Sequence, residues 1–255
     1  MAAPLIIIGT GGNALDILDV VEAINRDAPT WELVGFLDDS RGLGSRYQGL
    51  EVLGGLRDAG RHTGRWIINA IGSDKSYRKR PDIIAQTKLG PDRFATLVHP
   101  RACVSSRASL GPGTCVNAGA VVGGGVAVGA HTWLGAGCVV GNDSVIEDYA
   151  MIAPRAVLTG FVRVRTAAYV GAGACVRQRT TIGDRSLVGL GAVVIGDVDP
   201  GTTVVGNPAR VLVRPPRPGK SSETPAPRPG LADTPPARPG LRDSPTPSAG
   251  DVEGD

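Results

Sequence analysis

The stretch VGNDSVIEDYAMIAPRAVLTG, residues 140–160, contains polar side chains that could hold a reacting group or accept its proton. Its three carboxylates are Asp143, Glu147 and Asp148, and Asn142 lies beside the first of them, but the stretch has no histidine. An asparagine amide cannot take up a proton at neutral pH, although it can orient a substrate or donate to a developing oxyanion. An aspartate can accept a proton, so Asn142 and Asp143 form the candidate catalytic pair of this stretch.

A second group of candidate residues follows the apolar segment PLIII near the start of the chain. A glycine-rich turn there comes directly after a predicted strand and opens a predicted amphipathic helix, a context in which bare N–H groups can cradle a phosphate. Two aspartates end the next predicted strand, where a carboxylate can accept hydrogen bonds from a ribose or a base edge. The predicted substrate-binding residues are Gly9, Gly11, Gly12, Asp38, Asp39 and Gly72. The alternative is a tight structural turn with aspartates that cap a loop.

Asn142 and Asp143 lie within a repeat of six residues, which must position them. Steps of six from Val98 to Val194 give seventeen positions, and every one is aliphatic. This period is typical of a parallel β-helix, in which three hexads close one coil and the aliphatic residue points inward. The seventeen hexads predict five to six coils. Glycine often follows the aliphatic residue, as at Gly123 and Gly135, and we attribute this to sharp corners.

The chain divides into three predicted regions. Residues 1–96 alternate strands and helices, which predicts a small α/β domain equivalent to half of a Rossmann fold. Residues 97–213 form the predicted β-helix. Residues 214–255 are rich in proline and poor in apolar side chains, so we expect a disordered tail.

Composition limits the function classes. The net charge of +3 is too small to predict a nucleic-acid partner, and no apolar run reaches the roughly 18 residues that span a bilayer. The four cysteines show neither a CxxC motif nor a pairing with histidine, so we expect no metal site. The N-terminus lacks the pattern of a signal peptide. The sequence therefore predicts a cytoplasmic protein without a nucleic-acid, membrane or metal partner.

Both folded parts together resemble the bacterial sugar O- and N-acyltransferases, a family that includes sialic acid O-acetyltransferases and UDP-4-amino-sugar N-acetyltransferases. The resemblance covers residues 4–213 and rests on IIIGTGGNA, VGFLDD, AIGSDKSYR, VHPRACVS, the hexads, IEDYAMIAPRAVLTG and VVGNPARVL. It implies a homotrimer of left-handed β-helices. It also implies acetyl-CoA or another acyl-CoA in the groove between neighbouring coils, and a nucleotide sugar bound by the N-terminal domain.

The chain departs from the family's pattern at the catalytic positions. Such proteins have a general-base histidine where this sequence has Asn142, and a second histidine beside the acyl group where it has Met151. The chain's three histidines are His62, His99 and His131, and of these His131, two hexads before Asn142, is the candidate base. An amine can be partly nucleophilic without a base, whereas an alcohol cannot. The missing histidine therefore favours N-acylation of an amino sugar. Asp143 is the titratable residue next to Asn142.

The late hexads offer small residues against which the pantetheine arm of an acyl-CoA could run, and an arginine for its phosphates. The predicted cofactor-binding residues are Met151, Gly171, Gly173, Gly189, Gly191, Ala192 and Arg210. Two alternatives stay open. The chain could be a non-catalytic family member that binds a ligand or partner, or an acyltransferase with a different donor or base.

Overall fold

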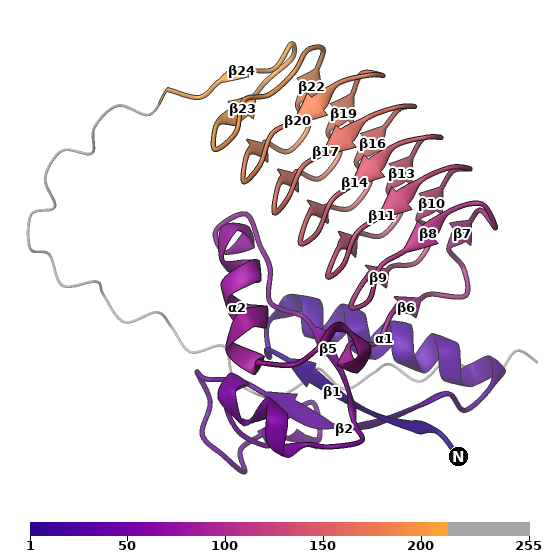
Figure 1. The fold of residues 1–255 in the computed structure, drawn as a ribbon, viewed down its shortest axis with the longest axis vertical. Coiled ribbons are helices and arrows are strands. Elements are labelled where there is room, and N and C mark those ends of the chain that lie inside the picture. The colour runs from indigo at the N-terminus through magenta and orange to yellow at the C-terminus, as the bar shows by residue number, and fades with distance from the viewer. Residues whose placement is uncertain (214–255) are drawn as a thin grey trace, which may run out of the picture. The chain divides into compact units, whose positions relative to one another are not determined.

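The computed structural model describes residues 1–213, which form one compact unit. An α/β region is followed by a parallel β-helix, as predicted (Figure 1). The predicted disordered tail, residues 214–255, lies outside the described residues.

The α/β region contains a three-stranded parallel sheet with the strand order β2-β1-β5. Its strands are β1 (Ala3–Ile8), β2 (Trp31–Leu37) and β5 (Trp66–Asn69). The other elements of this region are α1 (Gly12–Asp27), β3 (Arg46–Tyr47), β4 (Leu50–Glu51), η1 (Leu56–Arg61), η2 (Tyr77–Lys79), α2 (Arg80–Thr87) and η3 (Pro91–Arg93). Because the three sheet strands are parallel, their carboxyl ends meet at one edge, which positions the loops that follow them.

Helix α1 packs one apolar face on this sheet. Ala14, Ile17, Val20 and Val21 are buried, and their spacing of three and four residues places them on one side of the helix. The helix ends at Asp27, two residues before Pro29, which cannot continue a helix. The predicted order of strand, glycine turn and helix is thus confirmed.

The β-helix has three faces of short strands. The first face holds β6 (Leu97–Val98), β9 (Cys115–Val116), β12 (Trp133–Leu134), β15 (Met151–Ile152), β18 (Tyr169–Val170), β21 (Leu187–Val188), β23 (Thr203–Val205) and the antiparallel β24 (Arg210–Val211). The second face holds β7 (Cys103–Val104), β10 (Val121–Val122), β13 (Val139–Val140), β16 (Val157–Leu158), β19 (Cys175–Val176) and β22 (Val193–Val194). The third face holds β8 (Ser109–Leu110), β11 (Ala127–Val128), β14 (Val145–Ile146), β17 (Arg163–Val164) and β20 (Thr181–Ile182).

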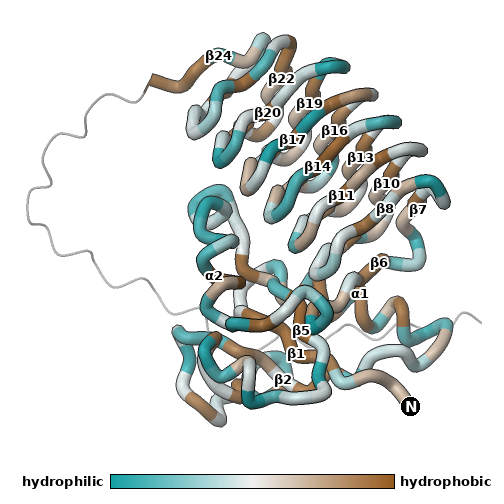
Figure 2. Tube along the Cα trace, in the orientation of Figure 1, coloured by the Kyte–Doolittle hydropathy of each residue, from teal (hydrophilic) through white to brown (hydrophobic). Residues whose placement is uncertain are grey.

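Each predicted hexad residue is the second residue of one of these strands, from Val98 in β6 to Val194 in β22. Val121 pairs with Val139 and Val122 with Val140, so one coil takes 18 residues. The second strand residues form the apolar core of the β-helix, and all of them from Val116 onward are buried. Figure 2 shows the strands mostly in brown and the corners in paler or teal colours. The hexad prediction of the core is confirmed.

The reason proposed for the glycines after the aliphatic residues is wrong. Gly135 and Gly171 are not among the residues with positive φ. A Cβ at Gly135 would lie 2.7 Å from the backbone nitrogen of Pro154, and one at Gly171 would lie 2.6 Å from that of Leu190. These glycines are therefore needed because the next coil approaches the backbone closely.

Positive φ falls two residues later in the hexad. It recurs every six residues, at Gly113, Gly119, Gly125, His131, Gly137, Asp143, Tyr149, Arg155, Phe161, Ala167, Gly173, Arg179, Arg185 and Gly191. Eight of these fourteen are not glycine, so the coil geometry holds ordinary side chains in the left-handed region. Both His131 and Asp143, two of the candidate catalytic residues, occupy this position.

The first face packs against the α/β region. The outward residues Leu97, Cys115, Trp133 and Met151 are buried in the cluster that also contains residues of β1 and α1. The second face differs, because its outward residues are apolar and either half-buried or exposed. They are Cys103, Val121, Val139, Val157, Cys175 and Val193.

Candidate functional site

A cleft of about 670 Å³ opens in the α/β region where β1, β2 and β5 end. Its lining includes every predicted substrate-binding residue: Gly9, Gly11, Gly12, Asp38, Asp39 and Gly72. These residues come from three loops that are distant in sequence. They meet because the carboxyl ends of parallel strands lie at one edge of the sheet.

The glycine turn leaves the start of α1 open to the cleft. Gly9 has φ of +91°, and a Cβ there would overlap the side chain of Ile71. A Cβ at Gly11 or Gly12, in contrast, would meet no atom within 4 Å. No side chain caps the helix, and its first turn carries no acidic residue. The first turn of α1 therefore lies at the cleft with its N–H groups uncapped by any side chain, which suits a phosphate.

Asp38 has a structural role at the wall of the cleft. Its Oδ2 accepts hydrogen bonds from the Thr10 amide (2.8 Å) and hydroxyl (2.6 Å), and its Oδ1 accepts from the Ser40 amide (2.7 Å) and hydroxyl (2.6 Å). Burial by itself would raise the pKa of Asp38, but these hydrogen bonds outweigh it and lower the pKa below the usual aspartate value. Since a carboxylate accepts about four hydrogen bonds, the acceptor capacity of Asp38 is filled by Thr10 of the glycine turn and by Ser40.

Asp39 is the more accessible of the two aspartates. Its Oδ1 accepts from the Leu56 amide at 2.9 Å, and the residue is exposed. It also lines a second hollow of about 350 Å³, here called the side groove, which shares Asp38 and Asp39 with the cleft. Of the two predicted carboxylates, Asp39 is the one with acceptor capacity left for a ligand.

Four further polar residues of the cleft region were not predicted from the sequence. Asn13 donates from Nδ2 to the Gly72 carbonyl at 2.8 Å and so joins α1 to the loop after β5. Thr10, Ser40 and Arg41 belong to the hydrogen-bond network around Asp38. Each lies within two residues of a predicted site residue, and this proximity was the only signal available in the sequence.

The candidate catalytic pair lies on the corner between β13 and β14. Asn142 donates from Nδ2 to Oδ2 of Asp143 at 2.8 Å, and both residues are exposed. A carboxylate can only accept, so the amide nitrogen must face Asp143 and the Asn142 Oδ1 must face away from it. A Cβ at Gly160, on the next coil, would lie 2.9 Å from this Oδ1. Asn142 therefore presents a fixed acceptor beside a carboxylate.

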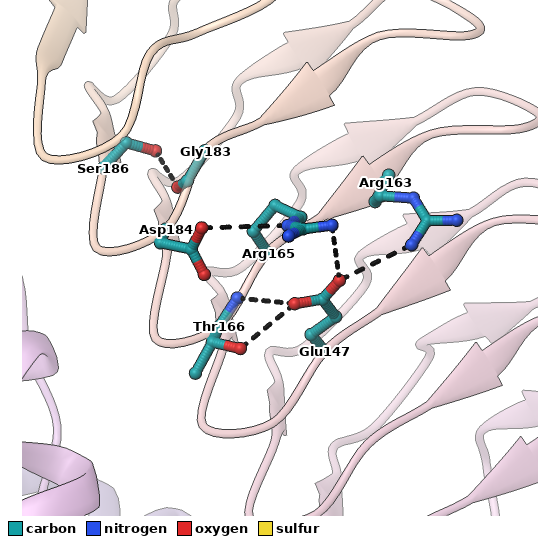
Figure 3. Close-up of polar contacts among 7 residues, drawn as sticks. All are labelled: Glu147, Arg163, Arg165, Thr166, Gly183, Asp184 and Ser186. Atoms are coloured by element: carbon teal, nitrogen blue, oxygen red, sulfur yellow. Dashed lines mark hydrogen bonds and ion pairs between the residues drawn. The ribbon is translucent and has the colours of Figure 1, made fainter.

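The other two carboxylates of this stretch hold coils together. Glu147 accepts from the Thr166 amide (3.2 Å) and hydroxyl (3.0 Å), and its Oε1 lies 3.3 Å from Arg165 and 3.6 Å from Arg163 (Figure 3). Asp148 accepts from the Ala130 amide at 2.7 Å. The side-chain carboxylate of Asp143 has only Asn142 as a hydrogen-bond partner among the described residues. The structure thus leaves Asp143 as the carboxylate of this stretch that is open to a substrate.

His131 lies on a different corner, between β11 and β12, and is buried. Its ring stacks on Tyr149 at 5.2 Å and packs edge-on against Phe94 at 4.5 Å. Burial, and next the charge of Arg80, lower the pKa of His131 from 6.5 to about 4. The ring is neutral at pH 7 but packed between aromatic side chains, and it does not meet the Asn142 corner.

Arg80 is a buried cation that the sequence did not reveal. It is 1% exposed and donates to the backbone carbonyls of Ile71 (2.7 Å), Tyr149 (3.2 Å) and His131. Burial lowers the pKa of Arg80 to about 10, which still leaves it charged at neutral pH. Arg80 therefore links the wall of the cleft to two corners of the β-helix.

Met151 lies on the first face, 4% exposed, and packs against the α/β region. A Cβ at Gly72 would lie 2.6 Å from the Met151 sulfur. Gly72 thus serves the contact between the two regions as well as lining the cleft.

The small residues predicted to bind acyl-CoA divide into two groups. Ala192 is fully buried, and Gly171 and Gly189 lie against the next coil, so all three serve coil packing. Gly173 and Gly191 are exposed, and a Cβ at either would meet no atom within 4 Å. These two are stacked one coil apart and present bare backbone to solvent on the corner between the first and second faces. Arg210 is exposed in β24, at the far end of the β-helix.

Within residues 1–213, no three His, Cys, Asp or Glu side chains are grouped so that they could hold a metal ion. No helix in the same residues is long and apolar enough to cross a membrane.

Comparisons with known proteins agree with both regions. The PglD N-terminal domain matches residues 4–81, and the bacterial transferase hexapeptide (six repeats) matches residues 125–160. The acetyltransferase domain of PglB from Neisseria gonorrhoeae is 32% identical with a TM-score of 0.71, over 82% of this chain and 100% of that domain. The same domain has also been solved with acetyl coenzyme A.

A second similar structure is a His-to-Asn mutant of perosamine N-acetyltransferase from Caulobacter crescentus, in complex with CoA and GDP-perosamine. It is 27% identical with a TM-score of 0.73, over 83% of this chain and 97% of that one. Comparison with curated protein sequences gives no match.

A PglD-type domain followed by hexapeptide repeats defines a bacterial transferase of the β-helix class. Within that class, the chain belongs to the family of bacterial sugar acyltransferases. It is an acyltransferase.

Proposed function

We propose that this acyltransferase moves an acyl group from acyl-CoA to the amine of a nucleotide-linked amino sugar. The cleft is the observation that carries the proposal, because it joins an open helix N-terminus to an accessible carboxylate, Asp39. These two features suit a phosphate and a ribose or base, respectively. The perosamine N-acetyltransferase binds CoA and GDP-perosamine, a substrate of this kind.

The proposed reaction takes place beside Asn142 and Asp143. The amine nitrogen attacks the thioester carbonyl, so that a C–N bond forms and the C–S bond breaks. Asn142 Oδ1 accepts a hydrogen bond from the amine and holds its lone pair toward the thioester. Attack turns the nitrogen into an ammonium far more acidic than that of the free amine, and Asp143 accepts its proton. The CoA thiolate leaves and is protonated.

The acyl-CoA site proposed from the structure uses the bare backbone at Gly173 and Gly191. These glycines lie at one edge of the second face, and Asn142 lies at the other edge. We therefore propose a homotrimer in which the active site forms between chains. The apolar outward residues of the second face, such as Val139, would be covered by a neighbouring chain.

The decisive test of activity is the release of free CoA thiol with acetyl-CoA and a panel of amino sugars, nucleotide-linked and free. We expect wild-type turnover with a nucleotide-linked amine and none with the matching alcohol. Asn142→His would place a base next to Asp143, and we expect it to raise turnover and to add activity on hydroxyl acceptors. High wild-type activity on an alcohol would contradict the proposal, since it would require a base other than this pair.

The assembly is tested by light scattering on the full chain of 26.2 kDa. We expect three times this mass, and a stable monomer in dilute solution would contradict the trimer. Val139→Glu on the second face should break the assembly. Val145→Glu on the third face is the matched control, because both valines are half-buried outward residues of their strands.

A further inference from the structure

Arg41 stands on the rim between the cleft and the side groove. Its Nε donates to the Thr10 hydroxyl at 2.8 Å, and its guanidinium lies 4.9 Å from the centre of the Tyr47 ring. Thr10 belongs to the glycine turn and lines the cleft, whereas Arg41 itself lines the side groove. Two contacts thus hold an exposed arginine at the glycine turn, so less side-chain freedom is lost when it binds a ligand.

The charge of Arg41 is not neutralised inside the protein. Within residues 1–213, no carboxylate lies within 4.0 Å of its guanidinium nitrogens. The carboxylate of Asp38 is reached only through Thr10, and its oxygens already accept from Thr10 and Ser40. Only Nε has a hydrogen-bond partner in the described residues, so both Nη groups of Arg41 are available to a ligand.

The uncapped N-terminus of α1 supplies a second positive feature at the same turn. The N-cap residue is Gly11, which offers no side chain, and the space above Gly11 and Gly12 is open. An oriented guanidinium and free helix N–H groups on one turn are complementary to a group with several anionic oxygens.

We propose that Arg41 binds the diphosphate of the nucleotide-linked substrate, together with the N–H groups at Gly11 and Gly12. This inference rests on the proposed function and assigns a residue to one part of its substrate. The cleft and the side groove meet at Asp38 and Asp39, beside Arg41.

The test is calorimetric titration of the full chain with UDP, GDP and dTDP, followed by the nucleoside of whichever binds most tightly. We expect Arg41→Gln to weaken the diphosphate by about 10- to 100-fold, since a charge-assisted, bidentate contact is lost. Binding of the nucleoside should change less than about 2-fold, because a neutral ligand offers the guanidinium no charge. The diphosphate affinity of Arg41→Lys should be intermediate, since lysine keeps the charge but lacks the planar guanidinium that makes two parallel hydrogen bonds.

Arg46→Gln is the matched control, because Arg46 is an exposed arginine on the adjacent strand β3. It should bind the diphosphate as the wild type does, and thermal melts of all variants check that they are folded. If Arg41→Gln binds the diphosphate as tightly as the wild type, the inference is overturned while the proposed function stands. Equal weakening of nucleoside and diphosphate would also overturn it, since Arg41 would then contact the nucleoside. If the wild type binds none of the three diphosphates at millimolar concentration, the proposed substrate class fails.

Discussion

The α/β region and the β-helix bring their candidate residues together in different ways. In the α/β region, three loops from separate parts of the sequence converge on one cleft, because parallel strands end at one edge of the sheet. In the β-helix, each hexad moves the chain one face further, so Asn142, His131 and Gly173 lie on three different corners. A sheet edge can therefore make a site within one chain, whereas this β-helix spreads its candidates over separate edges.

Glycine shows the same contrast. Gly11 and Gly12 leave space open for a ligand, whereas Gly135 and Gly171 leave space for the next coil. Only the open space at Gly11 and Gly12 forms part of a cleft. The β-helix consequently offers exposed corners, such as that of Asn142 and Asp143, and in the proposed homotrimer a neighbouring chain would complete the site.

The largest effect is expected at the Asn142 corner. Asp143→Asn should lower turnover by about 10- to 10³-fold, since a weak base is lost. The replacement can still accept the hydrogen bond from Asn142 and tolerates the left-handed φ of 54°. Thiol release measures the rate. An unchanged rate would show that the amine reacts without Asp143. Asp148→Asn is the control, because Asp148 serves coil packing.

A pair of glycine substitutions tests the contrast between the two regions. Gly171→Ala should lower the free energy of unfolding by about 3 kcal/mol, because its Cβ would meet the next coil. Gly12→Ala should leave it unchanged or raise it by up to about 1 kcal/mol, because alanine favours a helix and the space is open. Urea unfolding measures both. Equal destabilisation would remove the proposed difference between the two uses of glycine.

His131 should make stability depend on pH. Its pKa is about 4 in the folded protein and 6.5 as the ordinary value, so between these pH values the unfolded chain binds a proton that the folded protein does not. The free energy of unfolding should therefore fall as the pH falls through this window, by about 2–3 kcal/mol between pH 7 and 4.5. His131→Asn should show a smaller fall in the same urea experiment. An identical pH dependence would exclude His131 as its cause.

The smallest effect is expected for the charged network on the third face. Glu147→Gln should lower the free energy of unfolding by about 0.5–1 kcal/mol at low salt and by less at high salt. Its partners Arg163 and Arg165 are about half exposed, and water therefore weakens their electrostatic attraction to Glu147. Arg26→Gln, which breaks a more exposed ion pair on α1, should leave the unfolding midpoint unchanged. A loss of several kcal/mol at Glu147 would show that the network is shielded from water, as by a neighbouring chain.

Much of the fold and part of the site could be predicted from the sequence. The seventeen hexad residues were found because a β-helix repeats one local environment, and the aliphatic residue must recur with its period. The residues of the cleft were found because a strand, a glycine turn and a helix are contiguous in the chain. Asp38 lines the cleft, but its hydrogen bonds to Thr10 and Ser40 were not predictable from its position in the sequence.

By itself, the sequence determined the period of the β-helix, the α/β order of elements and the absence of a histidine at Asn142, because each of these is written in neighbouring or regularly spaced residues. Only the tertiary structure decided which polar side chains are already occupied. Arg80 meets the carbonyl of Tyr149 across 69 residues and that of His131 across 51, and Arg41 meets Thr10 across 31. Such contacts depend on how separate elements pack, and the burial and charge that set the pKa of His131 depend on the same packing.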